Sequence, residues 1–271
     1  MKKIKISKSE IFYNSHKYNV WLKLKDYIDG EQLKKLVEKV EKCINSACVF
    51  VLWWDWTILK TIRQVYDKNI PILWINFGTK WFLLNNLEDI NKCTEFIKIN
   101  YPLIECTIKT KKEIISRVAF NEIDIRADTW KVLDLEIILV KKWEKNLNLS
   151  LKWDWFIYSS PAGTTGYNYS LGWPIIPHSL DAFILTPKAP LFPRNFRPIV
   201  LEQTRKVIIK NINRLSDIKI ICDWSDFFDT KDEEIEVILE KSEDSINFLF
   251  PKDSKNTLKD KIFLEQGFEI I

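Results

Sequence analysis

Glycine is the residue that this sequence lacks most clearly. It accounts for 6 of 271 residues, about 2 per cent, where about 7 per cent is usual. Tryptophan is correspondingly frequent, with 12 residues. Because glycine is the residue that best tolerates positive φ, a chain with so few glycines has few positions for tight turns or for close approach of its backbone to a ligand.

Other scarcities exclude whole classes of protein. The chain has 2 histidines and 5 cysteines without a CxxC pair, which argues against a structural zinc site or a disulfide framework and predicts a cytoplasmic protein. Its longest apolar run, residues 47–54, is much shorter than the roughly 20 residues that span a bilayer, so no membrane partner is expected. A net charge of +4 is too small to indicate nucleic-acid binding, so no nucleic-acid partner is expected.

The pattern of apolar residues predicts two domains. Up to residue 100, strand patterns at 4–6, 47–52 and 70–75 alternate with helix patterns at 33–44, 57–68 and 87–99. This order predicts a Rossmann-like α/β domain with a parallel sheet over residues 1–100. Over residues 101–250 the apolar residues alternate in short segments, which predicts a β-rich, mainly antiparallel domain. We expect residues 251–271 to dock back on the first domain.

The first motif with chemical content surrounds Asp55, in the sequence Trp53-Trp54-Asp55-Trp56-Thr57. If the three tryptophans are read as glycine, the segment becomes a strand, a GGDGT turn and a helix, whose backbone N–H groups can approach a phosphate. A carboxylate at the end of a strand is also well placed to accept a hydroxyl proton. The alternative for so short a motif is an ordinary Asp turn before a helix.

Two further segments carry polar groups in the second half. Asn121 and Glu122 offer an amide and a carboxylate suited to ribose hydroxyls or base edges, although a solvated strand end is the alternative. Residues 159–175, SSPAGTTGYNYSLGWPI, combine small hydroxyl residues with glycines and Tyr167, a composition that can wrap around a polar ligand. The only nearby imidazole is that of His178, which is expected to be structural, so a serine hydrolase is excluded.

Tryptophan stands in these motifs where glycine would fit. Replacing tryptophan by glycine also gives ordinary turn sequences at residues 72–82 (ILWINFGTKWF), 151–156 (LKWDWF) and 222–226 (CDWSD). Applied to all twelve tryptophans, the replacement gives the chain an ordinary glycine content. We hypothesise that the gene uses UGA for glycine, as some bacterial lineages do, and that its UGA codons have been read as tryptophan. The alternatives are a tryptophan-rich protein with an unusual core and a decayed enzyme whose turns were overwritten.

Together the motifs resemble those of the NAD kinase family over nearly the whole chain. WWDWT stands where that family has GGDGT, and Asn121–Glu122 matches its NE pair. WDW and SSPAGTTGYNYSLGWPI match its GDG and STPTGSTAYxxSxGGPI, and residues 185–201 match as well. The resemblance implies phosphorylation of the 2′-hydroxyl of the adenosine ribose of NAD by ATP or polyphosphate, with Mg²⁺ on the donor phosphates, in a dimeric or tetrameric homo-oligomer.

The resemblance also implies roles for individual residues. Asp55 would be the catalytic proton acceptor, and the remaining assigned residues would bind the substrates. These binding residues are Trp56, Lys60, Asn121, Glu122, Lys131, Lys152, Asp154, Thr165, Gly166, Tyr167 and Ser170. Lys131 and Lys152 align less closely than the others, and no protein residue is assigned to a metal. We expect Asp55, Asn121, Asp154 and Tyr167 to converge on a cleft between the two domains.

Departures from the family pattern define the alternatives. Ala162 replaces a usual Thr and Gly166 a usual Ala, both mild changes. Literal tryptophans at 53, 54 and 56 would fill the phosphate space and prevent the turn, so the chain would be a nucleotide-binding pseudokinase. A diacylglycerol-type lipid kinase shares the GGDG-like turn, but Asn121–Glu122 and residues 159–175 favour a dinucleotide. The absence of GxxxxGK[ST] excludes a P-loop kinase.

Overall fold

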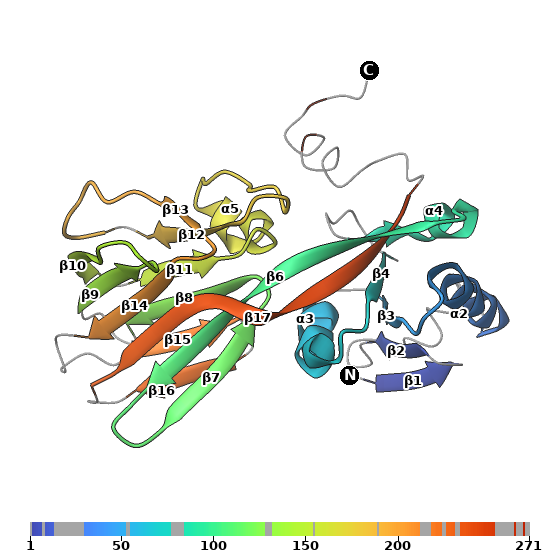
Figure 1. The fold of residues 1–271 in the computed structure, drawn as a ribbon, viewed down its shortest axis with the longest axis horizontal. Coiled ribbons are helices and arrows are strands. Elements are labelled where there is room, and N and C mark those ends of the chain that lie inside the picture. Colours follow the sequence, from blue (N-terminus) through green and yellow to red (C-terminus); the bar gives the residue numbers. More distant parts are fainter. Residues whose placement is uncertain are drawn as a thin grey trace. The chain divides into compact units, whose positions relative to one another are not determined.

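The chain forms two compact units (Figure 1), Met1–Tyr101 with Ser245–Ile271, and Pro102–Asp244. The computed structural model describes residues 2–6, 9–13, 30–52, 55–76, 84–127, 132–153, 155–188, 190–211, 218–223, 226–230, 234–252, 263 and 268. Residues 245–250 belong to the first unit, whereas the sequence placed them in the second domain. The expected docking of the tail concerns residues that lie mostly outside the described ones.

The first unit is an α/β structure with parallel strands. Its elements are β1 (Lys2–Ile6), β2 (Ser9–Tyr13), α2 (Gly30–Ile44), β3 (Val49–Leu52), α3 (Asp55–Val65), η1 (Tyr66–Lys68), β4 (Ile72–Asn76), β5 (Asn85–Asn86), α4 (Leu87–Lys92) and the ends of two long strands, β6 (Phe96–Lys109) and β17 (Glu236–Pro251). β3 pairs in parallel with β2 and β4, and β4 pairs in parallel with β5 and, at Phe248, with β17. This pairing confirms the predicted α/β class.

Helix α2 shows how the sequence builds this unit. Its buried residues Leu33, Leu36, Val37 and Val40 recur at helical spacing, so they form one apolar face. That face joins residues of β3 and β4 in a single hydrophobic core. All four residues of β3 are buried, as expected for a strand in a parallel sheet with neighbours on both sides.

The helix predicted over residues 87–99 is wrong beyond its first half. Helix α4 ends at Lys92, and residues from Phe96 onward form strand β6. The spacing of Ile90, Cys93 and Ile97 suggested one helical face, but Ile97 is exposed while Ile90 and Cys93 are buried. Strand formation prevails here because β6 pairs with β17, a segment far away in the sequence.

The second unit is antiparallel and β-rich, which confirms the predicted class. Its strands are the remainder of β6 and β17, β7 (Ile114–Ala119), β8 (Glu122–Ala127), β9 (Leu133–Val140), β10 (Leu147–Trp153), β11 (Trp155–Ser159), β12 (Ala182–Pro187), β13 (Ile199–Glu202), β14 (Lys206–Asn211), β15 (Ile218–Cys222) and β16 (Asp226–Thr230). One sheet has the order β13-β12-β11-β8-β15-β16, and another contains β17, β14, β9 and β10. Among the described residues of this unit, helical turns are confined to η2 (Gly163–Thr165) and α5 (Tyr167–Ser170).

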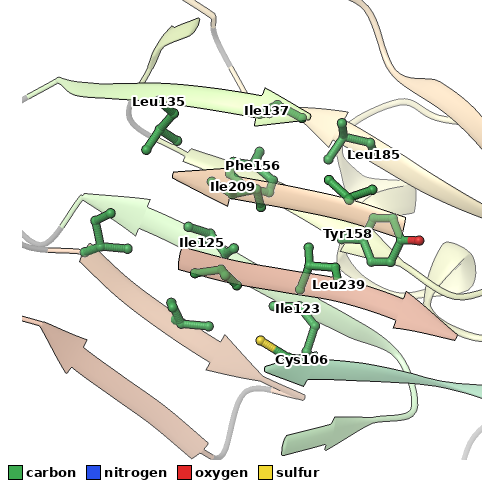
Figure 2. Close-up of a cluster of buried hydrophobic side chains, with 14 of the residues drawn as sticks. Cys106, Ile123, Ile125, Leu135, Ile137, Phe156, Tyr158, Leu185, Ile209 and Leu239 are labelled. Carbon is green, nitrogen blue, oxygen red and sulfur yellow. The ribbon is translucent and has the colours of Figure 1, made fainter. Parts of the chain in front are cut away.

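The core of the second unit is built from alternate residues of both sheets. Figure 2 shows Ile123 and Ile125 of β8 and Phe156 and Tyr158 of β11 in one cluster with residues of β9, β12 and β14. Because side chains alternate across a strand, the residues between them on β8 and β11 point to the opposite face of the sheet. That opposite face carries the polar residues of the candidate site. None of the helices in the described part of the chain is long and apolar enough to cross a membrane.

Candidate active site

The Asp55 motif lies at the start of a helix. Asp55 is the first residue of α3, three residues after β3 ends, and α3 runs for 11 residues. Helix starts expose N–H groups and carry partial positive charge, so this position suits a phosphate. Thr57 is buried, and its Oγ1 has no hydrogen-bond partner among the described residues. Lys60, nearly one and a half turns after Asp55, is exposed.

Several predicted residues of this and other motifs fall outside the described part of the chain. Trp53, Trp54, Lys131 and Asp154 are not described, and for Asp55 and Trp56 only the backbone is. Asp55 belongs to the first unit, whereas Asn121 and Tyr167 belong to the second. Their convergence on one cleft therefore stays a prediction.

The Asn121–Glu122 pair is held in place by a residue that the sequence did not single out. The carboxylate of Asp223 accepts the backbone N–H groups of Phe120 (2.8 Å), Asn121 (2.7 Å) and Glu122 (3.2 Å). Asp223 is itself buried and adopts φ 49°, a left-handed conformation that Asp tolerates better than most residues. The only sequence signal for it was its place directly after a strand, in the CDWSD segment.

The turn at residues 159–166 packs directly on the Asn121 backbone. Ser160 donates its N–H to the Asn121 carbonyl (2.8 Å) and its hydroxyl to the Phe120 carbonyl (2.5 Å). Gly163 lies so close that a Cβ at this residue would be 2.2 Å from the Asn121 carbonyl oxygen. The structure thus joins two predicted motifs that lie about forty residues apart in the sequence.

The same turn brings Gly166 close to Glu122 of the NE pair. Thr165 donates its hydroxyl to the Ala162 carbonyl (3.0 Å), which stabilises the turn internally. A Cβ on Gly166 would be 3.7 Å from Oε2 of the buried Glu122. Ser170, at the end of α5, is exposed.

A charged and aromatic cluster continues from Glu122 along the polar face of β8. Asp124 and Arg126 follow at alternate positions, and Arg126 pairs in register with Trp155 of β11. Tyr167 stacks on Trp155 at 5.5 Å between ring centroids, and its hydroxyl accepts the Lys188 ammonium at 3.1 Å. Burial raises the pKa of the Asp124 carboxyl to about 6, although the Arg126 charge opposes this shift.

Lys152 differs from the other predicted binding residues. It is exposed on β10, and its backbone N–H donates to the Phe192 carbonyl. Its neighbours Leu151 and Trp153 are buried in the core, so the Lys152 side chain lies on the outer face of that strand. Among the described residues, its side chain forms no hydrogen bond or ion pair with the cluster around Tyr167. Asp124 and Lys188 do belong to that cluster but were not predicted. Asp124 stands in no motif, and Lys188 lies in the matched segment 185–201, in which no residue was assigned a role.

The tryptophans whose side chains are described range from buried to exposed, and Trp155 and Trp173 are partly exposed. Trp153 is buried and donates its indole N–H to the Lys188 carbonyl at 3.0 Å, and Trp74 is buried beside Phe248. Trp143, by contrast, is 92% exposed and adopts φ 68°, a conformation that glycine takes readily and tryptophan does not. Trp143 thus favours the glycine hypothesis, while Trp153 fits a literal tryptophan.

Metal-binding residues do not cluster in this region. Within the described ranges, no three His, Cys, Asp or Glu residues lie close enough together to hold a metal ion. The polar groups of the site are instead arranged as hydrogen-bond partners, with carboxylates at Glu122 and Asp124 and cations at Arg126 and Lys188.

A family model and similar proteins both identify the family of this chain. The family described as "ATP-NAD kinase C-terminal domain" matches residues 94–249. The NAD kinase of Buchnera aphidicola subsp. Acyrthosiphon pisum is 31% identical over 229 residues, which cover 80% of this chain and 74% of that protein. The NAD kinase of Rickettsia prowazekii is 29% identical over 245 residues, which cover 87% of this chain and 91% of that protein.

Two solved structures share the fold. Yeast NADH kinase complexed with NADH superimposes with a TM-score of 0.66 and 21% identity, over 82% of this chain and 66% of the yeast chain. An NAD kinase from Archaeoglobus fulgidus in complex with ATP gives a TM-score of 0.62 and 22% identity, over 87% of this chain and 96% of the other.

Proposed function

Because this chain belongs to the NAD kinase family, we propose that it transfers the terminal phosphate of ATP to the 2′-hydroxyl of the adenosine ribose of NAD, giving NADP. The observation that best supports this function is the packing of the 159–166 turn on the Asn121–Glu122 pair. It places the Asn121 amide and the buried Glu122 carboxylate beside a close backbone turn, and such polar groups can recognise ribose hydroxyls and base edges.

The dinucleotide would be held mainly by the second unit. The Glu122 carboxylate can accept hydrogen bonds from ribose hydroxyls, and the Asn121 side-chain amide can both donate and accept hydrogen bonds. Tyr167 offers a ring for stacking, and its hydroxyl is fixed by Lys188. Thr165 and Gly166 would bring the backbone of the turn close to the ligand. Lys131, Lys152, Asp154 and Ser170 remain proposed contacts on the strength of the family pattern.

Phosphate transfer would take place at the start of α3. The N–H groups of the helix start would bind donor phosphates, with Lys60 and the position of Trp56 close by. Asp55 would orient the 2′-hydroxyl and accept its proton. We propose that Mg²⁺ enters with ATP as part of the substrate and neutralises charge on the phosphates, as it does in other phosphoryl transfers. Polyphosphate as an alternative donor, a homo-oligomeric state and a cytoplasmic location stay predictions.

The test is an NADP-forming assay with Asp55→Asn, in the chain that carries glycine at the tryptophan positions. General-base catalysis contributes about 10²–10⁴-fold, so turnover should fall by at least about a hundredfold while the affinity for NAD changes little. Asp67→Asn is the matched control, because Asp67 is an exposed acid in the same unit. Near-normal turnover by Asp55→Asn would show that Asp55 is neither the base nor an essential orienting group.

Trp153 supports a second candidate function. Its buried indole with a paired N–H is what a chain adapted to tryptophan would show, and such a chain would bind the dinucleotide without transferring phosphate. Sequencing the twelve codons separates the two candidates. UGA codons support the kinase with glycine at these positions, and UGG codons support the non-catalytic binder.

A further inference from the structure

Helix α5 is too short to fix its own direction. It has four residues, Tyr167–Ser170, and its N-cap residue Gly166 makes no side-chain capping bond. Isolated helices shorter than about 12–15 residues are marginal in water, so a helix of this length takes its direction from the residues on which it packs. Tyr167 and Ser170, which the family pattern assigns to the dinucleotide, stand at its two ends. The contacts that fix α5 therefore fix both of these residues.

One buried hydrogen bond joins α5 to the sheet. The Thr186 hydroxyl donates to Oδ1 of Asn168 at 2.6 Å, and both residues are 0% exposed. Asn168 is the second residue of α5, and Thr186 lies on β12. The two are 18 positions apart in the sequence, so the bond is a tertiary contact and not part of the helix. Figure 1 shows α5 beside β12, as this bond requires.

Thr186 is a fixed point for this bond. All six residues of β12 are buried, and Thr186 pairs in register with Ile157 of β11, so the sheet holds it in place. Lys188 is two residues further along, which is the spacing at which strand side chains share a face. The Lys188 ammonium donates to the Tyr167 hydroxyl at 3.1 Å. Two neighbouring residues of α5, Tyr167 and Asn168, are thus bonded to alternate residues of one segment.

Asn168 contributes less to stability than its bond suggests. Its amide Nδ2 is buried and has no hydrogen-bond partner in the part of the chain that the structure describes. A buried donor without a partner costs at least as much free energy as one hydrogen bond provides. Because the two effects oppose each other, the Asn168–Thr186 bond adds little to the overall stability. What the bond supplies is a direction, since it holds α5 at one distance and one orientation from β12.

We propose that Asn168 and Thr186 are a positioning pair for dinucleotide binding, because their hydrogen bond holds α5 on β12. The bond thereby places the two ends of that helix, Tyr167 and Ser170, for the substrate. Neither member of the pair touches the dinucleotide, since both are fully buried. The proposal rests on the proposed function, because it takes NAD to be the ligand of the second unit. ATP would bind at the start of α3, so its binding should not depend on this bond.

The first experiment is Thr186→Val in a parent chain that carries glycine at the tryptophan positions. In that parent Tyr167 lacks its stacking partner Trp155 and depends more on the hydrogen bonds of α5. Valine keeps the shape of threonine and removes the hydroxyl. The dissociation constant for NAD, measured by calorimetry, should rise about tenfold, as the loss of one hydrogen bond allows. In NADP-forming assays, kcat and the KM for ATP should change less than about twofold.

A double variant separates positioning from stability. Thr186→Val alone leaves the buried Asn168 amide without a partner, so it should lower the melting midpoint. Adding Asn168→Leu removes both polar partners, and such a replacement can be nearly neutral for stability. The midpoint should therefore return towards that of the parent, while the affinity for NAD stays about tenfold low because the directional contact is still missing. If Thr186→Val alone folds poorly, the double variant carries the test.

Two control variants accompany these changes. Thr186→Ser keeps the hydroxyl and should bind NAD within about threefold of the parent. Ser242→Ala removes a buried hydroxyl elsewhere in the same unit, where Ser242 is 5% exposed on β17 and accepts the N–H of Asp244 at 3.2 Å. Ser242→Ala should lower the melting midpoint and leave the affinity for NAD unchanged.

Three results would overturn the proposal: parent-like NAD affinity in Thr186→Val, recovery of affinity together with stability in the double variant, or an equal loss of affinity in Ser242→Ala. NADP formation by the parent judges the proposed function separately. Turnover by a parent whose NAD affinity is insensitive to Thr186→Val refutes the positioning pair alone. Weaker NAD binding by Thr186→Val in a chain without turnover refutes the kinase function and not the pair. A parent that neither binds NAD nor forms NADP refutes both.

Discussion

A single methyl group at Gly163 should disrupt the turn on which the candidate site depends. A Cβ at this residue would lie 2.2 Å from the carbonyl oxygen and 2.6 Å from the carbonyl carbon of Asn121, and 2.6 Å from the Ser159 hydroxyl oxygen. Two of these atoms are backbone and cannot rotate away. The Asn121 backbone is also fixed by its hydrogen bonds to Ser160 and Asp223.

The size of the effect follows from the shift that the methyl group demands. Van der Waals contact requires a displacement of roughly 1 Å, which would break the Ser160–Asn121 hydrogen bond. Overpacking costs about 1–3 kcal/mol and a lost hydrogen bond about 1 kcal/mol, so Gly163→Ala should destabilise the protein by about 3 kcal/mol. At about 2–4 °C per kcal/mol for a protein of this size, the melting midpoint should fall by about 6–12 °C. The affinity for NAD should fall more than about tenfold.

Gly166→Ala provides the matched control in the same turn. A Cβ there would lie 3.3 Å from the Gly163 carbonyl oxygen, a tight but tolerable contact. The family pattern that residues 159–175 resemble has Ala at this position. Thermal unfolding followed by circular dichroism, with NAD binding measured by calorimetry, compares the two variants. Similar midpoints and affinities for Gly163→Ala and Gly166→Ala would refute the argument, because the turn would then be free to move away from Asn121.

Two further predictions concern a strained residue and a buried acid. Trp143→Gly should raise the free energy of unfolding by up to about 1 kcal/mol. Glycine removes the strain of the left-handed backbone in the folded state, and this gain exceeds the stability lost because glycine makes the unfolded chain more flexible. Trp143→Ala retains the Cβ strain and should show no such gain, and equal thermal midpoints for both variants would contradict this. Since the folded pKa of Asp124 is raised to about 6, its charge destabilises the fold increasingly as pH rises from about 4 to 6. Asp124→Asn should therefore stabilise the protein by about 2 kcal/mol at pH 8 and not at pH 3.5, and a gain independent of pH in urea titrations would refute this.

The sequence predicted the architecture where a single segment carries the signal. Alternation at Ile104, Cys106 and Ile108 identified a strand because the side-chain period of a strand is two residues. The helix at 87–99 was misread because the pairing of its second half with β17 depends on residues far away in the sequence. Local spacing does not contain that information.

The candidate site was predictable only in part, for a similar reason. Asn121, Glu122 and Tyr167 belong to contiguous motifs, so a family pattern could identify them. Asp223 contacts Asn121 across about a hundred residues of sequence, and its CDWSD segment was singled out for its tryptophan and not for Asp223. Lys188 likewise acquires its role only when strand pairing places it beside Trp155.

The most direct test of the account is NADP formation by two versions of the chain. One version carries tryptophan at the twelve positions and the other carries glycine at all of them. Each is incubated with NAD, ATP and Mg²⁺, and NADP is measured with an NADP-specific dehydrogenase. The account predicts steady turnover by the glycine version and none by the tryptophan version. Equal turnover by both versions, or none by the glycine version, would contradict it.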